Sequence, residues 1–461
     1  MRTFVNSRPY LTLFAASCIA SVAFADTYEV ATFEIDVTVP IGHALMGGGI
    51  APAKEIIDPL HAQGIVLLGP AEPIVWLSVD WCEIRNDAYD EWRDAIAQAA
   101  ETTRERVLLA AIHQHDTPVV DFAAQRLLDE AGLEKSLCDT VFVRECISRS
   151  ARAVEEALPS AQPATHYGVG TAEVERVASN RRIISESGDA TFGRNSSAPD
   201  ESIRAKPVGL IDPNLHTLSF WNGDTPVAAL STYAVHPMSY YGRGGVSADF
   251  IGMARSKMQR EIPDTPYLYF SGCSGDVVAG KHNDGSDPER EKLADRMYQG
   301  MREAWAKTQR HPIQQVEFRS VPLTLPIRDT DAFTEKEQRR TLQNTSTTIF
   351  NRNLAAMGLS WRARHAAGIP IDICAIDFGA AQFLLMPAES FVEYQLAAQR
   401  LRPDSTVLVA GYGESAPGYI PSESAVQEHF IETHTWCWVA PEAPTAMHRA
   451  IRKALAQTKL R

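Results

Sequence analysis

Short apolar runs alternate with longer amphipathic stretches along most of the chain, and this alternation leaves few folds open. Residues 74–79 form a run typical of a buried strand, residues 86–101 have helical periodicity, and residues 107–112 are again apolar. A strand, a helix and a second strand in this order predict a right-handed crossover between parallel strands. The pattern indicates an α/β fold in which mixed β-sheets are flanked by helices.

The same alternation continues to the end of the chain. Further strands are predicted at 218–221, 227–234, 267–270, 373–378, 382–386 and 406–410, and further helices at 137–157, 250–261, 289–308, 335–353 and 393–401. Polar segments at 184–206 and 281–288 are predicted loops, and neither is typical of a linker between domains. Because no internal sequence repeat is found either, we expect residues 26–461 to form a single domain.

The N-terminal residues 1–25 have the features of a secretory signal peptide. Arg2 and Arg8 precede an apolar run at 10–24, and Ala23-Phe24-Ala25 is a small-x-small cleavage site before Asp26. The apolar run is short for a membrane span, although an uncleaved N-terminal anchor is the alternative. We therefore expect a secreted or periplasmic protein without a transmembrane span.

Charge and cysteine content narrow the partners and the covalent framework. The formal net charge is −13 among 461 residues, which disfavours a nucleic-acid partner because phosphate binding relies on clustered Lys and Arg. Six of the seven cysteines lie beyond the signal, so disulfides are permitted. We expect no more than one bridge, with Cys138 and Cys146 the nearest pair, and the others buried as apolar residues.

Histidines follow two of the predicted strands. His113 and His115 come directly after the strand at 107–112, and side chains at i and i+2 of an extended segment point to one face. They can approach one centre, as a metal ligand and a proton carrier, or they can be two hydrogen-bonded structural imidazoles. His236 follows the strand at 227–234, where a core or capping role is the alternative.

These histidines belong to a series of five short motifs, which in this order resembles the catalytic domain of the neutral ceramidases over residues 28–435. The motifs are His113-Gln114-His115, Ala234-Val235-His236-Pro237, the Gly-rich run at 270–277, Met386-Pro387-Ala388-Glu389 and Gly418-Tyr419-Ile420-Pro421. The resemblance implies a zinc amidase of mixed α/β architecture. It implies that Zn²⁺ is held by His113, His236, Glu389 and Tyr419, whose nitrogen and oxygen donors suit that ion.

The resemblance also implies roles for residues around the metal. His115 would be the acid/base, and Arg181 would polarise the scissile carbonyl, although Arg182 beside it makes that assignment ambiguous. Gly47 and Gly48 would line the substrate site. Asp276 is placed with the substrate-binding residues and is expected to hold the Gly-rich loop in position.

Three departures from the family pattern bear on the substrate. The family's Thr-His-Thr-His-Ser becomes Ile-His113-Gln-His115-Asp, and Phe430 stands in the region of a second tyrosine that donates to the substrate carbonyl. Phe430 cannot donate, so His429 or His434 is a candidate replacement. Only residues 420–461 follow Tyr419, so the resemblance covers the catalytic domain without the family's C-terminal β-sandwich domain.

Three hypotheses follow for the function. The first is an exported zinc-dependent amidohydrolase that acts on a small-molecule or lipid-like N-acyl substrate, with N-acylsphingosine as one candidate. The second is a zinc-dependent carbohydrate-directed deacylase, esterase or glycan-cleaving hydrolase. The third is a catalytically inactive periplasmic binding protein, which the four intact ligand types disfavour.

Overall fold

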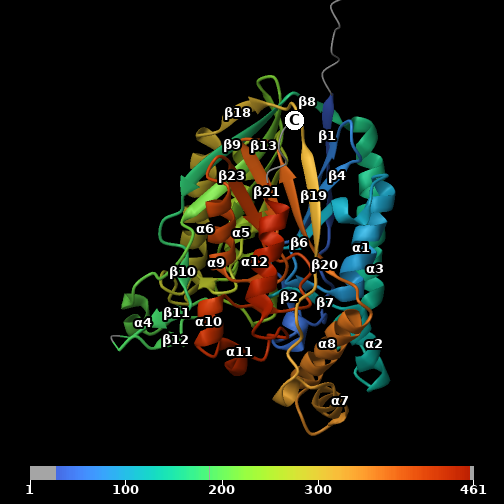
Figure 1. The fold of residues 1–461 in the computed structure, drawn as a ribbon, viewed down its shortest axis with the longest axis vertical. Coiled ribbons are helices and arrows are strands. Elements are labelled where there is room, and N and C mark those ends of the chain that lie inside the picture. The colour runs from blue at the N-terminus through green and yellow to red at the C-terminus, as the bar shows by residue number, and fades with distance from the viewer. Residues whose placement is uncertain (1–26, 186, 457–461) are drawn as a thin grey trace, which may run out of the picture.

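Three β-sheets form the centre of the computed structural model, which describes residues 27–185 and 187–456 (Figure 1). The first sheet has the strand order β6 (Val107–Ala111), β4 (Ile74–Val79), β3 (His61–Leu68), β1 (Tyr28–Asp36) and β8 (Gln162–Ala164). The second has the order β16 (Tyr267–Ser271), β14 (Thr225–Tyr233), β13 (Asn214–Asn222), β9 (His166–Glu173) and β18 (Gln309–Pro312). The third has the order β19 (Glu317–Leu323), β20 (Ile371–Asp377), β21 (Ala381–Leu385) and β23 (Thr406–Ala410).

The three sheets share one connectivity. Each contains three antiparallel strands in chain order, then a helix, then a further strand parallel to the third. The parallel pairs are β4 and β6 around α1 (Asn86–Ala99), β14 and β16 around α5 (Asp249–Glu261), and β21 and β23 around α9 (Val392–Leu401). The three units share strand directions and burial, but they do not share residue types. For this reason the repeat was not recognised in the sequence.

A shared aromatic core joins the inner faces of the sheets. Trp76 of β4 contacts Phe220 of β13 and Phe383 of β21, with ring centroids 5.8 Å and 6.0 Å away. All three side chains are fully buried. Burying a large apolar side chain contributes about 1.5–3 kcal/mol, so this cluster fixes the sheets to one another.

Helices cover the outer faces of the sheets (Figure 1). α1 and α3 (Thr140–Ala157) pack on the first sheet, α5 and α6 (Asp287–Ala306) on the second, and α9 and α12 (Ala443–Ala454) on the third. The remaining helices lie toward the lower end of the molecule in Figure 1: α2 (Phe122–Glu130), α4 (Glu201–Ala205), α7 (Glu335–Gln343), α8 (Ile349–Ala366), α10 (Glu423–Gln427) and α11 (Phe430–Thr433). The predicted class, mixed sheets flanked by helices, is confirmed.

Two local predictions from the sequence are wrong. The helix predicted at 335–353 is two helices, α7 and α8, because the Thr348 hydroxyl accepts a hydrogen bond from the Asn351 N–H (3.2 Å) and caps a new helix start. The loop predicted at 184–206 contains the strand β12 (Ala190–Phe192), paired with β11 (Arg182–Ile184), and the helix α4.

Cys138 and Cys146, the nearest pair in the sequence, are not bridged, and all six cysteines of the described residues are free and buried. The export signal predicted at 1–25 lies outside the described residues. Within residues 27–185 and 187–456, no helix is both long enough and apolar enough to cross a membrane.

Candidate metal centre

Loops at the carboxyl ends of strands from all three sheets meet at one point. His113 follows β6, His236 follows β14, and Glu389 of the two-residue strand β22 (Glu389–Ser390) follows β21. One donor atom from each of the three lies within 4.8 Å of the other two, and all three side chains are buried. Crevices beyond the carboxyl ends of strands are common ligand sites in α/β proteins.

The distances within this group fit a tetrahedral metal ion. Glu389 Oε2 lies 3.2 Å from His113 Nε2 and 3.1 Å from His236 Nε2. With metal–ligand bonds of about 2.0–2.2 Å, neighbouring ligands of a tetrahedral zinc ion are separated by about 3.4 Å. Glu389 therefore stands almost at ligand spacing from both histidines, and the donor atoms of the two imidazoles lie within 4.8 Å of each other.

Backbone carbonyls orient both imidazoles toward the centre. His113 Nδ1 donates to the Cys82 carbonyl at 3.0 Å, and His236 Nδ1 donates to the Ser274 carbonyl at 2.5 Å. Each ring therefore turns its Nε2 toward Glu389. Metal-binding histidines are held in this way, with the second nitrogen donating to a carbonyl or carboxylate.

The charges of the group also suit a cation. Burial alone would raise the pKa of the Glu389 carboxyl, but His113 and His236 beside it lower that pKa well below its usual range. Burial, reinforced by the positive charge of Arg181, lowers the pKa of His236 to about 3. An ionised carboxylate beside a neutral imidazole is a typical donor set for zinc.

His115 reaches the centre by a different backbone route from the one predicted. The chain is not extended at His113, whose φ of +70° lies in the left-handed region, so the i and i+2 argument does not apply. This turn nevertheless places His115 Nε2 3.4 Å from His113 Nε2. Burial and the neighbouring imidazoles lower the pKa of His115 well below its usual value, which favours the neutral form of its ring.

Tyr419 lies beside Glu389 because their short strands pair. β24 (Tyr419–Ile420) runs parallel to β22, with Tyr419 opposite Glu389. Burial raises the pKa of the Tyr419 phenol, although the nearby Arg181 opposes this effect. Arg181 lies over the Tyr419 ring at 5.6 Å. Tyr419 lines the same cavity as Glu389, His113 and Arg181.

The choice between Arg181 and Arg182 is clear from their contacts. Arg182 Nε donates to Glu428 Oε2 at 2.6 Å, so that guanidinium is occupied outside the centre. Arg181 faces the cavity around the metal ligands, and its buried Nε has no hydrogen-bond partner within the protein. Of the two arginines, only Arg181 lines this cavity.

Asp276 acts on the centre through the backbone. Its carboxylate accepts hydrogen bonds from Asn180 Nδ2 at 2.8 Å and from the Val392 N–H at 2.9 Å, and its carbonyl accepts from the Arg181 N–H at 2.7 Å. Asp276 does not line the cavity around the ligands. Its hydrogen bonds tie the segment that carries Arg181 to the start of α9.

The remaining residues assigned to the substrate lie behind the cavity wall. Gly47 has a φ of +63°, and a Cβ there would lie 3.3 Å from Trp436, while one on Gly48 would lie 2.7 Å from Asn353 Nδ2. Phe430 is 1% exposed and packs edge-on against Tyr419, with ring centroids 5.5 Å apart. None of these three residues lines the cavity, and Gly47 and Phe430 contact the lining residues Trp436 and Tyr419.

His434, and not His429, is the histidine that accompanies Tyr419. Its ring centroid lies 5.8 Å from that of Tyr419, and its Nδ1 donates to the Phe430 carbonyl at 2.9 Å. The His429 side chain is 80% exposed. Of the two proposed replacements for the missing tyrosine, only His434 is near the centre.

The cavity at the centre is small and mixed in character. It encloses about 170 Å³, which is less than the about 300–1,000 Å³ of typical small-molecule sites. Its wall consists of Met46, Cys82, His113, His115, Arg181, Asn195, Ser196, Met238, Tyr241, Glu389, Tyr419 and Trp436. Asn195, Ser196, Tyr241 and Trp436 were not anticipated, since no local pattern marks a residue that reaches the site from a distant loop.

Tyr412 was also missed, although it contacts both His113 and His236. Its ring stacks on His113 with centroids 4.3 Å apart and planes at 17°. Its hydroxyl pairs with the Ser274 hydroxyl at 2.7 Å and lies 3.5 Å from His236 Nδ1. The signal in the sequence is weak: Tyr412 lies two residues beyond the end of β23, as His113 lies two residues beyond the end of β6, and the predicted strand 107–112 hides this equivalence.

Comparison with known proteins gives a likeness of fold. No protein-family model and no curated protein matches the sequence. The fold is similar to that of the neutral ceramidase from Pseudomonas aeruginosa, with a TM-score of 0.65 and 17% identity over 94% of this chain and 74% of that one. A ceramidase complexed with C2 gives a TM-score of 0.67 and 16% identity over 94% and 75%. The chain therefore has a ceramidase-like fold with a buried His/His/Glu group that can bind a metal.

Proposed function

We propose that the protein is an exported zinc-dependent hydrolase that cleaves an amide bond of an N-acyl substrate. The observation that carries this proposal is the convergence of His113 Nε2, His236 Nε2 and Glu389 Oε2 at ligand spacing, with both imidazoles oriented by backbone carbonyls. The ceramidase-like fold supports the reaction class. The basis for export is the signal-like sequence of residues 1–25.

The proposed ligands of the ion are His113, His236, Glu389 and Tyr419. When bound there, zinc supplies Lewis-acid polarisation of the carbonyl and lowers the pKa of water toward neutrality. The protein holds the ligands in a buried site, where little reorganisation is needed on binding.

The chain itself supplies the proton transfers. The neutral His115 ring accepts a proton from the attacking water as the new carbon–oxygen bond forms. It returns that proton to the amide nitrogen as the carbon–nitrogen bond breaks, so that an acid and an amine leave. Arg181, whose buried Nε is without a partner in the protein, donates to the carbonyl oxygen as negative charge develops on it.

A substrate panel tests the reaction class. Purified protein with one equivalent of zinc is assayed with N-acyl lipids that include N-acylsphingosine, with N-acyl amino acids and with acetylated sugars. We expect amide hydrolysis that a chelator abolishes and zinc restores, and we expect His115→Gln to keep zinc while losing turnover. Zinc-independent hydrolysis, or full activity in His115→Gln, would contradict the proposal.

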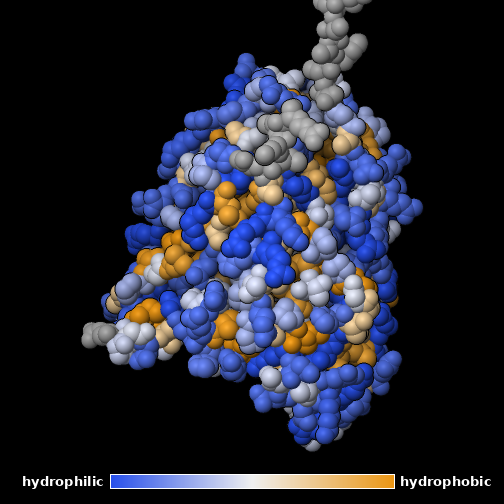
Figure 2. All heavy atoms as spheres, in the orientation of Figure 1, coloured by the Kyte–Doolittle hydropathy of each residue, from blue (hydrophilic) through white to orange (hydrophobic). Residues whose placement is uncertain are grey.

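The size of the cavity favours a second candidate, a carbohydrate-directed deacylase or esterase that uses the same ion. A volume of about 170 Å³ holds a short acyl group, and Asn195 and Ser196 offer polar contacts at its wall. On the face drawn in Figure 2, hydrophobic residues occur in small groups among hydrophilic ones. Faster turnover of acetylated sugars than of long-chain amides would select this candidate.

A further inference from the structure

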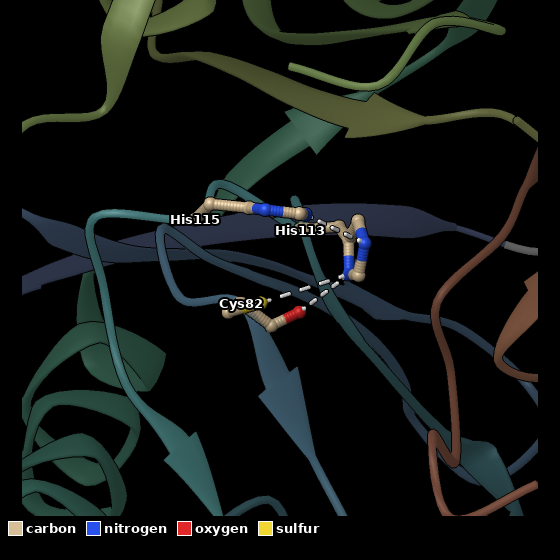
Figure 3. A group of neighbouring side chains, drawn as sticks. All are labelled: Cys82, His113 and His115. Atoms are coloured by element: carbon tan, nitrogen blue, oxygen red, sulfur yellow. Dashed lines mark hydrogen bonds between the residues drawn. The ribbon is translucent and has the colours of Figure 1, made fainter. Parts of the chain in front are cut away.

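A thiol lies on the wall of the metal cavity, beside the proposed proton carrier. Cys82 follows β4, and its Sγ lies 4.0 Å from His113 Nδ1. Together with His113 and His115 it forms a second group whose donor atoms all lie within 4.8 Å of one another. Figure 3 shows Cys82 and His115 approaching the His113 ring from the same side.

One ring nitrogen of His115 is available to bind an ion. Its buried Nδ1 has no hydrogen-bond partner, and its Nε2 is directed at His113, 3.4 Å away. Since His113 presents its Nε2 to Glu389, the two side chains left to bind another ion are those of Cys82 and His115. A thiolate sulfur and an imidazole nitrogen are donors that soft cations prefer.

We propose that Cys82 and His115 form a second, weaker cation site that takes thiophilic divalent ions, namely Cd²⁺ or zinc in excess of one equivalent. On binding, the Sγ–H bond breaks, the Sγ–metal bond forms and the proton passes to solvent, with no change in oxidation state. The site is weaker than the first because it offers two protein donors in place of four. An ion at this site would bind the His115 ring and slow turnover, and this expected inhibition rests on the proposed function. The binding of the ion does not depend on the proposed function.

Cadmium titration of the zinc-loaded protein tests the binding. We expect a sulfur-to-cadmium charge-transfer band in the ultraviolet, with one equivalent of cadmium added while the first equivalent of zinc is retained in elemental analysis. Cys82→Ala and the isosteric Cys82→Ser should lose the band and bind cadmium about tenfold or more weakly. Cys273→Ala is the matched control, because that buried thiol packs on Met386 Sδ at 3.6 Å and does not line the cavity.

A band of equal size in the Cys82 variants would overturn the proposal, and so would cadmium uptake without a band in the unmodified chain. The kinetic arm is separate: excess zinc should inhibit the unmodified chain at concentrations about tenfold below those needed for Cys82→Ala, each measured against its own uninhibited rate. If no substrate is found, the band and the stoichiometry still decide whether the site exists, so the two proposals can fail independently.

Discussion

His236 contributes to the candidate centre through one nitrogen, and its removal is the most direct test of metal binding. In His236→Ala, two donors and Tyr419 remain, so we expect zinc retention to fall by about 100-fold or more. Elemental analysis after dialysis against a chelator measures the change. His216→Ala is the control, since His216 is buried on β13 and its Nδ1 pairs with the Thr171 hydroxyl at 2.9 Å, away from the centre. Equal zinc retention in the two variants would show that His236 is not a ligand.

Tyr412 contacts the residues of the centre through its ring and through its hydroxyl. The effects of these two groups on metal affinity can be tested separately. Tyr412→Phe keeps the ring on His113 but removes the hydrogen bond to Ser274, whose carbonyl holds His236. We expect metal affinity to fall by about 10- to 100-fold, measured by competition with a chromogenic chelator. Tyr89→Phe loses a comparable buried hydrogen bond, to the Leu109 carbonyl at 3.0 Å, and should keep full affinity. An unchanged affinity in Tyr412→Phe would mean that the stacked ring alone suffices.

Among the elements, the loop after β16 is packed directly against the strand that carries Glu389. A Cβ on Gly275 would lie 2.2 Å from the Glu389 carbonyl oxygen, so Gly275→Ala must displace one of the two segments. We expect a loss of about 1–3 kcal/mol of stability together with weaker zinc retention, seen in thermal unfolding and elemental analysis. Gly193→Ala, where the nearest atom would be 3.8 Å away, should change neither property. Normal zinc retention in Gly275→Ala would show that β22 can move without disturbing the ligand.

The elements that could be predicted from sequence are those whose signal is local. The strand at 74–79 was placed to the residue because six successive buried positions are apolar or small, and 406–410 was placed equally well. β1, with alternating Glu and apolar residues and partial exposure, was missed, as was α2. The break between α7 and α8 depends on a single capping threonine inside a stretch with helical periodicity. Boundaries of this kind are set by one hydrogen bond, which residue periodicity does not register.

At the scale of the whole molecule, the candidate site is assembled from three sheets whose strands lie far apart in the sequence. His113, His236 and Glu389 were placed together by likeness to a family, and the structure brings them together. The spacing of these residues in the sequence could not have predicted that they meet, because each of them follows a strand of a different sheet. The residues that were not anticipated, such as Tyr412 and Trp436, meet the centre only through packing of the sheets and the C-terminal segment. Contacts of that kind depend on the complete fold.

A network of buried carboxyls joins α1, α8 and the loop after β23, and it contributes to the pH dependence of the stability of the whole molecule. Glu414 accepts hydrogen bonds from the N–H groups of Asn86 (2.8 Å) and Ala416 (3.0 Å), and Arg364 lies 3.5 Å from its second oxygen. Burial raises the pKa of Glu414 to about 7, although Arg364 opposes the increase. Burial likewise raises the pKa of Asp121, which pairs with the Asn86 side chain, to about 6.

The sign of the effect follows from which state holds the proton. Below the ordinary pKa of 4.5, Glu414 is protonated in both the folded and the unfolded chain, so it adds no pH dependence there. Between that value and about 7, the folded chain keeps a proton that the unfolded chain releases, so the free energy of unfolding falls as pH rises, by at most about 3 kcal/mol.

Glu414→Gln cannot titrate, and we expect its stability to fall less than that of the unmodified chain between about pH 5 and about pH 8. Denaturant unfolding at both pH values measures this difference, with Glu130→Gln, at an exposed position on α2, as the control. Parallel losses in the unmodified chain and in Glu414→Gln would show that Glu414 is ionised in the folded protein, and that its charge is balanced by Arg364.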